Sequence, residues 1–284
     1  RTLFSSDHET FRDTVRKFLE NEAVPHHEEW EQTGQVPKEL WRKAGEQGFL
    51  CPMVSEEYGG IDADFLYSVV VSEEISRAGL TGIGWGLHTE IVAPYIEHYG
   101  SEEMKQRLLP KMVSGELIGA IAMSEPGAGS DLQGVKTNAV KEGDHYILNG
   151  SKTFITNGQN ADIVIVVAKT DASKGAKGIS LLIVEEGMEG FQKGKNLKKV
   201  GMKAQDTSEL FFQDVKVPAE NLIGDEGMGF IYLMQELPQE RLGIAINGLA
   251  MAESAFAHTL EYVKDRKAFV QPVADFQNPQ FNPA

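Results

Sequence analysis

The chain has 284 residues, enough for about two domains and for a full hydrophobic core. Hydrophobic residues make up 41% and charged residues 24%, an ordinary globular composition that excludes a disordered chain. The 27 basic and 42 acidic residues leave a net charge of −15, which argues against nucleic-acid binding and against docking on an anionic membrane.

Several other classes of protein lose support from simple counts. The apolar runs Ile163–Ala168 and Ile179–Val184 are far shorter than the ~20 residues that cross a bilayer, so we expect no membrane span. The single cysteine, Cys51, allows neither an internal disulfide nor a cysteine zinc cage, and the seven histidines show no metal-ligand spacing. We therefore expect no metal site. The segment Arg1–Thr10 has no apolar signal core, so we expect no signal in it that directs the chain out of the cell.

The first stretch, residues 1–117, has a helical pattern and predicts an all-α domain. Ser6 and Glu9 have capping-box spacing, and Phe11, Val15 and Phe18 then fall on one helix face. A second helix is expected over Phe65–Arg77, closed by Gly79, and a third after Ser101, whose next two residues are acidic. These apolar stripes are typical of core packing.

Residues 118–225 change to strand-length apolar runs and predict a β-domain. Gly143-Asp144 offers a hairpin turn, and Ile163–Ala168 lacks polar alternation, which indicates burial on both faces. Seven strands without intervening helices favour a small antiparallel barrel or sandwich. The predicted strands are Ile118–Met123, Val135–Val140, His145–Leu148, Lys152–Thr156, Ile163–Ala168, Ile179–Val184 and Glu209–Val215.

Residues 226–284 return to a helical pattern, which runs from Phe230 to about Lys267. Pro238 lies inside it and is expected to kink the helix, because proline removes a backbone donor. One apolar stripe is expected to face a core and comprises Leu242, Ile246, Leu249, Phe256, Leu260 and Val263.

Common catalytic motifs are absent. The sequence has no P-loop, no G-x-G-x-x-G after a strand, no H-E-x-x-H and no G-x-S-x-G. Rossmann dehydrogenases, P-loop enzymes, zinc proteases and serine hydrolases of the nucleophile-elbow type therefore lose support.

Two polar segments of the β-domain are candidates for a binding site. Residues 123–131 follow a predicted strand, and their glycines and serines can expose backbone N–H groups to a pyrophosphate or a polar ring edge. An ordinary strand-to-strand loop is the alternative. In the segment 149–158, Phe154 and Thr156 alternate onto one strand face, which could hold a flat ring and donate to its edge. A core aromatic beside a surface threonine is the alternative there.

Four motifs in this order resemble the acyl-CoA dehydrogenase family: S-E-P-G-A-G-S-D, N-G-S-K-T-F-I-T-N-G, E-R-L-G-I-A and R-K-A-F. The resemblance extends from Ser5 to about Gln277. It implies an N-terminal helical domain, a middle β-domain and a C-terminal helical bundle that is incomplete in this chain. It also implies bound FAD, an acyl-CoA substrate, a homotetramer and an electron-transferring flavoprotein as electron acceptor. The expected location is the cytoplasm of a bacterium or the mitochondrial matrix of a eukaryote.

The resemblance also implies roles for individual residues. The expected FAD contacts within the chain are Ile121, Ala122, Met123, Ser124, Gly129, Ser130, Phe154, Ile155 and Thr156, with Ser124 near the pyrimidine edge and Thr156 near N5. Arg266 and Gln277 would reach the FAD of a neighbouring subunit. The expected acyl-CoA contacts are Ser130, Ala176, Lys177, Pro238, Gln239, Glu240 and Arg241.

Glu240 is the expected catalytic base. Abstraction of a proton alpha to a thioester needs a carboxylate in a dry pocket, where desolvation raises its pKa. The long-chain and isovaleryl branches of the family carry this base just before an arginine, as in Glu240-Arg241. The residues K-A-Q-D-T and E-L-P-Q-E-R look most like long-chain acyl-CoA dehydrogenases. The implied reaction forms a trans-2-enoyl-CoA in fatty acid β-oxidation, with the α proton passing to Glu240 and the β hydride to the flavin.

The chain departs from the family pattern at its end. Val270 stands where the family usually has glycine, and two prolines in residues 278–284 replace a helix continuation. Three alternatives stay open: an isovaleryl or other branched-chain dehydrogenase, an acyl-CoA oxidase, and a non-catalytic flavin- or CoA-binding scaffold.

Overall fold

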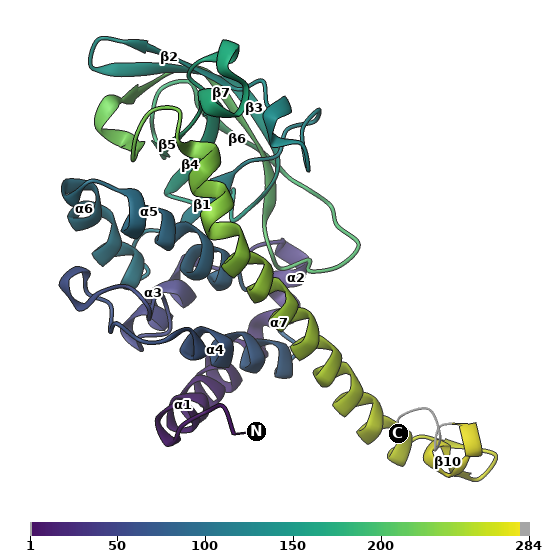
Figure 1. Cartoon of the computed structure of the whole chain (residues 1–284). Coiled ribbons are helices and arrows are strands. Elements are labelled where there is room, and N and C mark those ends of the chain that lie inside the picture. The colour runs from purple at the N-terminus through teal and green to yellow at the C-terminus, as the bar shows by residue number, and fades with distance from the viewer. Residues whose placement is uncertain (1, 279–284) are drawn as a thin grey trace.

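The computed structural model describes residues 2–278 and shows helices, then a β-sheet, then one long helix (Figure 1). The expected order of helical, β and helical regions is confirmed. The tail 279–284, with its two prolines, lies outside the described residues. In the first region the helices are α1 Ser6–Glu22, α2 His27–Thr33, α3 Lys38–Glu46, α4 Phe65–Arg77, α5 Ala93–Tyr99 and α6 Glu102–Val113.

Helix starts follow side-chain capping. The bounds of α4 match the prediction, with Asp64 as its N-cap, and Ser101 caps α6 as expected. The predicted cap of α1 was wrong by one residue: Ser5 is the N-cap, and its partner three positions on is His8. His8 supplies a ring nitrogen that accepts from the Ser5 backbone N–H at 3.0 Å, so a capping box forms without glutamate.

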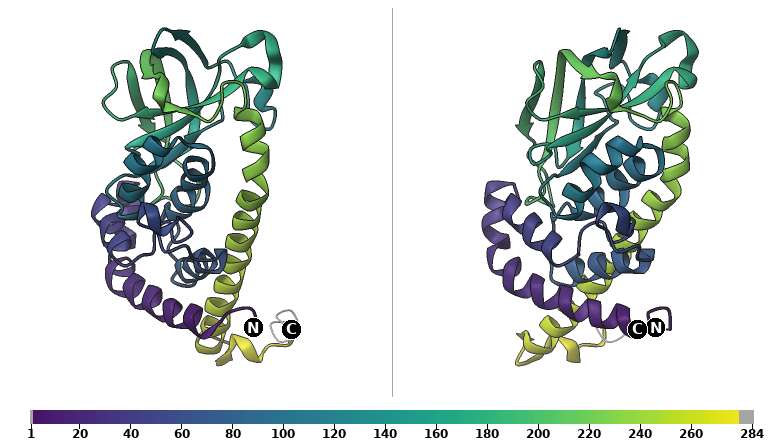
Figure 2. Two further views of the ribbon diagram at one scale, coloured as in Figure 1. Left: turned by 60° about the vertical axis from the view of Figure 1, so that its left-hand side comes forward. Right: turned by 90° about the vertical axis from the view of Figure 1, so that its left-hand side faces the viewer.

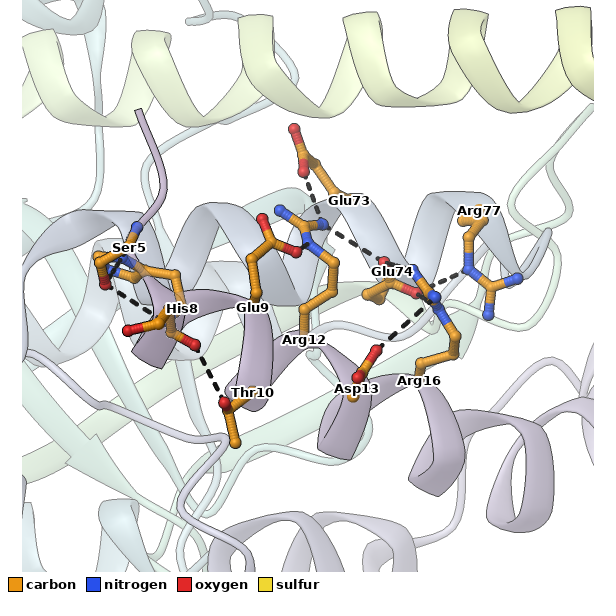
Figure 3. A network of polar contacts seen from close by, with 11 residues as sticks. Ser5, His8, Glu9, Thr10, Arg12, Asp13, Arg16, Glu73, Glu74 and Arg77 are labelled. Carbon is orange, nitrogen blue, oxygen red and sulfur yellow. Dashed lines mark hydrogen bonds and ion pairs between the residues drawn. The ribbon is translucent and has the colours of Figure 1, made fainter. Parts of the chain in front are cut away.

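Helices α1 and α4 are joined by a buried ion-pair cluster (Figure 3). The Glu74 side chain is 2% exposed and accepts from Arg16 at 2.9 Å and from Arg77 at 2.7 Å. Burial alone raises the pKa of Glu74, but these guanidinium groups outweigh it and hold the pKa below its ordinary value. Arg12 also reaches this carboxylate, at 3.3 Å. The cluster fixes the position of α1 relative to α4, and α4 lines the candidate site described below.

The β region is one curled sheet of eight strands, in the order β6-β7-β3-β2-β4-β5-β8 with β1 beside β4. Alternate side chains of β2, β3, β4, β5 and β7 enclose a common core that includes Tyr146, Leu148, Val166 and Phe212. The strands are β1 Gly119–Ala122, β2 Asn138–Glu142, β3 His145–Thr156, β4 Ile163–Lys169, β5 Ile179–Glu185, β6 Phe191–Asn196, β7 Thr207–Pro218 and β8 Leu222–Ile223.

The expectation of a purely antiparallel sheet was wrong. β1 pairs with β4 in parallel, from Gly119 opposite Ile163 to Ala122 opposite Val166, so the sheet is mixed. The chain enters β1 from α6 and reaches β4 only after the β2–β3 hairpin, which is the long crossover that a parallel pair requires. Burial of all of Ile163–Ala168 is confirmed.

Three strand predictions also differ from the structure. The predicted strand Val135–Val140 begins only at Asn138, because the N–H groups of Lys136 and Thr137 donate to the Glu125 carboxylate and not to a neighbouring strand. The two short strands predicted between 145 and 156 are one strand with two register shifts against β7. β6 was missed, because its sequence F-Q-K-G-K-N has neither apolar alternation nor β-branched residues.

Helix α7, Gly229–Asp265, continues without interruption across Pro238, and a short hairpin of β9 Lys267–Ala268 and β10 Gln271–Pro272 follows. Both views in Figure 2 show α7 leaving the sheet, passing the N-terminal helices and ending far from the sheet. The apolar stripe expected to be core is partly exposed: Leu242 is 51% and Leu249 61% accessible. Within residues 2–278, no helix is both long and apolar enough to cross a membrane.

His88 links the helical region to the sheet and should make stability fall in acid. Its fully buried ring accepts from the Gly119 N–H at 3.0 Å and donates to the Met112 carbonyl at 3.0 Å, an arrangement that requires the neutral imidazole. Burial lowers the pKa of His88 to about 4, against about 6.5 when unfolded. The unfolded chain therefore takes up a proton first as pH falls, so about 3 kcal/mol of stability is lost between pH 6.5 and 4. Denaturant unfolding of the parent and of His88→Gln across this range measures it. Equal pH slopes in the two proteins would contradict it.

Candidate functional site

A cavity of about 300 Å³ lies between α4, α7 and the end of β3, and we call it the Glu240 cavity. Its polar wall includes Glu240 from α7, Thr156 from β3 and Glu90 from the π-helical turn Leu87–Val92. Its apolar wall includes Ile83, Leu87 and Ile244. The structure thus brings together two residues that lie 84 positions apart in the sequence, Thr156 and Glu240.

Glu240 has the surroundings of a carboxylate kept from water. It is 7% exposed and accepts a hydrogen bond from the Tyr95 hydroxyl at 2.8 Å. Burial raises the pKa of Glu240, the nearby Glu236 raises it further, and the Tyr95 hydrogen bond only partly opposes this. A carboxyl with a raised pKa at a cavity wall is suited to take up a proton.

Glu236, one helical turn before Glu240, has a different environment. Its carboxylate accepts from the Tyr99 hydroxyl at 2.6 Å and from His98 Nδ1 at 2.9 Å. Burial raises the pKa of Glu236, but these hydrogen bonds and the charge of His98 outweigh it and lower the net pKa. Two carboxylates on one helix face therefore have pKa values pushed apart, and Glu240 is the one with the higher value.

The glycine loop that follows β1 is held by a buried ion pair. Lys152 Nζ donates to Glu125 Oε1 at 2.9 Å and to the Met123 carbonyl at 2.9 Å, and its side chain is fully buried. Burial lowers the pKa of Lys152 to about 8, so the amine stays charged at pH 7. The Thr153 N–H donates to the Ser124 carbonyl at 2.9 Å, which joins the loop directly to β3.

The end of β3 presents alternate side chains in opposite directions. Phe154 is 70% exposed, while Ile155 points into the core and is 3% exposed. Phe154 has φ of 60°, in the left-handed region, at the second register shift of β3. Thr156, two residues on, opens to the Glu240 cavity. The same-face placement of Phe154 and Thr156 stays a prediction, because the register shift between Lys152 and Ile155 interrupts the regular alternation here.

The other sequence-predicted residues of the β region lie around this face. Ile121 and Ala122 lie in β1 with their side chains in the core, so, like Ile155, they can present only backbone to a ligand. Ser124 and Met123 are half-buried, and Gly129 and Ser130 are exposed. A Cβ built on Gly129 would meet no atom within 4 Å, so the loop is open to solvent there.

The predicted acyl-CoA contacts come from two places. Ala176 and Lys177 lie in the turn before β5, and the Lys177 carbonyl lies against the loop that precedes α7. On α7, Pro238 and Arg241 are exposed, while the Gln239 amide donates to the Glu90 carbonyl at 3.2 Å. Of these contacts only Glu240 itself lines the Glu240 cavity.

Arg266 and Gln277 are separate from this site. Arg266 follows the last residue of α7, so it lies about 39 Å along the helix axis from Glu240 at ~1.5 Å per residue. Both residues are exposed, and both follow α7, whose end lies far from the sheet (Figure 2). They cannot reach the Phe154–Thr156 face of the same chain in this arrangement.

Sequence reasoning missed three residues of the site: Tyr95, Glu90 and Lys152. Tyr95 and Glu90 fall in a region predicted only as core helices, and no local pattern shows that they approach α7. Lys152 could have been found, because a lysine at an inward position of a strand needs a buried acidic partner. Across residues 2–278, no group of three or more His, Cys, Asp and Glu side chains is arranged to hold a metal ion.

Three family models match successive parts of the chain. The model described as "Acyl-CoA dehydrogenase, N-terminal domain" matches residues 5–116, the middle domain matches 120–215, and the C-terminal domain matches 227–284.

Known proteins match over nearly the whole chain. It is 56% identical over 282 residues to the mitochondrial long-chain specific acyl-CoA dehydrogenase of Sus scrofa, covering 99% of this chain and 66% of that protein. The chain therefore spans just under two thirds of that relative's length. The crystal structure of an acyl-CoA dehydrogenase from Geobacillus kaustophilus matches with a TM-score of 0.96 and 56% identity, covering 99% of this chain and 75% of that one. An acyl-CoA dehydrogenase from Bacillus anthracis complexed with FAD matches with a TM-score of 0.89 and 37% identity, covering 96% and 48%.

Proposed function

Because the chain belongs to the acyl-CoA dehydrogenase family, we propose that it carries out FAD-dependent α,β-dehydrogenation of a fatty acyl-CoA to a trans-2-enoyl-CoA. One observation carries the proposal. The carboxyl suited to accept a proton, on Glu240, and the strand end proposed to meet the flavin, at Thr156, line the same cavity. No step of this reaction needs a metal ligand or a nucleophile from the chain.

The β3 face has the shape and chemistry to hold FAD. Phe154, two residues before Thr156, leaves most of its ring uncovered, and a flat ring system could cover it. The adjoining loop offers open backbone at Gly127 and Gly129, where no side chain would obstruct a phosphate or ring edge. The FAD named in the Bacillus anthracis structure supports the same assignment. When bound there, FAD would supply a two-electron acceptor for the substrate's β hydride.

The chain's own residues would position and accept the proton that leaves the substrate. Glu240 would take the α proton with its carboxylate, and the low polarity of the cavity makes that carboxylate a stronger base than it is in water. The Tyr95 hydroxyl fixes one carboxylate oxygen at 2.8 Å and leaves the other to face the substrate. Ile83, Leu87 and Ile244 give the acyl side of the cavity an apolar lining.

The proposed substrate is long-chain. The Glu240 cavity shares Ile75, Ile83, Met202 and Asn247 with a second cavity of about 240 Å³ that extends along α7 to His258. The helix rises about 27 Å between Glu240 and His258 at ~1.5 Å per residue, which is room for a long alkyl chain. The 56% identity to a long-chain specific enzyme supports the same choice.

An anaerobic titration with acyl-CoAs of graded length tests the function, with flavin absorbance as the measurement. Bleaching by long straight chains supports the proposal, and preference for isovaleryl-CoA would favour the branched-chain alternative. Peroxide formation in air would favour an oxidase. A yellow protein that no acyl-CoA bleaches would be a binding scaffold, and the proposed function would then be wrong.

The remaining assignments belong to the same proposal. We divide the chain into domains 1–117, 118–225 and 226–284, which the three matched stretches support. The proposed assembly is a homotetramer and the proposed electron acceptor is an electron-transferring flavoprotein. Similarity to mitochondrial relatives supports the mitochondrial matrix for a eukaryotic source, and the cytoplasm is proposed for a bacterial one.

Replacement of Thr156 should slow flavin reduction without unfolding the protein. Thr156→Val keeps the side-chain shape and removes one hydroxyl that lines the Glu240 cavity. Loss of one hydrogen bond to a ring edge should cost about 0.5–1.5 kcal/mol, or about 2- to 13-fold in rate. Stopped-flow reduction by acyl-CoA measures it. Unchanged kinetics would remove Thr156 from the site.

Replacement of Arg266 should weaken FAD retention by removing a contact between neighbouring subunits. Arg266 lies far from the β3 face of its own chain, so any FAD contact must come from a neighbouring subunit. Arg266→Ala should therefore lose FAD on dilution, because binding and oligomerisation are linked. Gel filtration with flavin absorbance measures both. A monomer that retains FAD tightly would contradict this expectation.

A further inference from the structure

Glu90 is a carboxyl of the Glu240 cavity that the proposed reaction does not use. It lies in the π-helical turn Leu87–Val92, a rare backbone form that is frequent at functional sites. Within the part of the chain that the structure describes, no hydrogen bond or ion pair reaches its carboxyl group, and burial raises its pKa to about 7. Buried polar groups normally have a hydrogen-bond partner, so the Glu90 carboxyl group is left to water or to a ligand.

The Glu90 carboxyl group occupies space that is free because two neighbouring residues are glycines without side chains. A Cβ built on Gly243 of α7 would lie 2.7 Å from Glu90 Oε2, and one on Gly86 would lie 3.6 Å from Oε1. Gly243 is three residues after Glu240, so the Glu90 carboxyl lies about one helical turn, or ~4.5 Å along α7, beyond the proposed base. This is the direction in which the second cavity extends from the first.

An alkyl chain in the cavity would remove water from Glu90 and offer it no donor. Ile83, Leu87 and Ile244 are apolar, and the amide side chains of the wall have other partners. Asn247 donates to Ser72 at 3.5 Å, and Gln205 donates to Asn157 at 3.5 Å. A substrate with a hydroxyl at that depth would satisfy the carboxyl group. Sites built to hydrogen-bond a hydroxyl reject the analogue that lacks it far more strongly than apolar pockets reject an extra one.

We propose that Glu90 is a specificity-determining residue that makes the cavity select acyl chains bearing a hydrogen-bond donor, such as a hydroxyl a few carbons beyond the reacting pair, over plain chains of equal length. The proposal rests on the proposed function for the identity of the ligand as an acyl-CoA. It is independent of turnover, because it concerns binding along the acyl chain.

The test measures binding of trans-2-enoyl-CoAs to the FAD-loaded protein by calorimetry. Plain chains are compared with chains of equal length that carry a hydroxyl at successive carbons beyond C4. The parent should bind the best hydroxylated ligand at least 10-fold more tightly than the plain one. Glu90→Leu should reverse the order, and Glu90→Gln should keep part of the preference, because its amide oxygen still accepts.

Two further variants make the result specific. Gly243→Ala adds a methyl group 2.7 Å from Glu90 Oε2, so it should displace the carboxyl group and reduce the preference without changing any charge. Glu189→Leu removes an exposed carboxylate in the turn before β6 and should leave the preference unchanged. The proposal would be overturned if the parent bound the plain chain more tightly than the hydroxylated one. It would also be overturned if the parent and Glu90→Leu had the same ratio of affinities for the two ligands. Failure of the proposed function would differ, since no acyl-CoA would then bleach the flavin whatever the binding ratio.

Discussion

Glu240→Gln should still bind acyl-CoA but reduce its flavin about 10²–10⁴-fold more slowly than the parent, the usual loss for a general base. Glutamine keeps the size of the side chain and can still accept the Tyr95 hydroxyl through its amide oxygen. It cannot take a proton from the substrate. The raised pKa and 7% exposure of Glu240 mark it as the carboxyl prepared for that transfer.

The measurement is stopped-flow reduction under anaerobic conditions, together with the change in flavin absorbance on binding. A spectral change on binding without bleaching identifies a chemical defect and not a folding one. Glu261→Gln is the matched control, because Glu261 is an exposed carboxylate on the same helix that pairs with Lys264 at 2.8 Å. Reduction of Glu240→Gln at the parent rate would show that Glu240 is a structural residue.

Lys152→Met should lower the free energy of unfolding by about 3–5 kcal/mol, as expected when one partner of a buried ion pair is removed. The variant leaves the Glu125 carboxylate buried, with only the N–H groups of Lys136 and Thr137 as donors. It also removes the hydrogen bond to the Met123 carbonyl, which fixes the start of the glycine loop. We therefore expect weaker FAD retention together with lower stability.

Denaturant unfolding and flavin content measure both effects. Lys216→Met, at an exposed position of β7, should change stability by less than about 0.5 kcal/mol. The double variant Glu125→Gln/Lys152→Met should be less destabilised than Lys152→Met alone, because no unpaired charge remains. If the free energy of unfolding of Lys152→Met is within about 1 kcal/mol of the parent value, the ion pair does not hold the loop.

The sequence by itself determined the order of helical, β and helical regions, the bounds of α4, the Ser101 cap of α6 and the burial of β4. These features depend on local patterns: the apolar period, a capping serine, an unbroken β-branched run. It also identified Phe154, Thr156 and Glu240 as site candidates, because short motifs preserve the residues that the chemistry needs. The α1 cap was misplaced by one residue, because the capping box in the structure has histidine, His8, in place of the usual glutamate or glutamine.

Tertiary structure alone decided what depends on distant contacts. The parallel pairing of β1 with β4 follows from the path of the chain, and no local signal distinguishes it from an antiparallel pair. The exposure of Leu249 differs from expectation because an apolar stripe specifies a surface to be covered but not what covers it. The raised pKa of Glu240 arises from its burial and from the nearby charge of Glu236, against the opposing hydrogen bond from Tyr95. Glu90 approaches α7 only because Gly243 leaves room. Electrostatic environment and cavity shape are properties of packed neighbours, and residues such as Tyr95 and Glu240, 145 positions apart, become neighbours only when the chain folds.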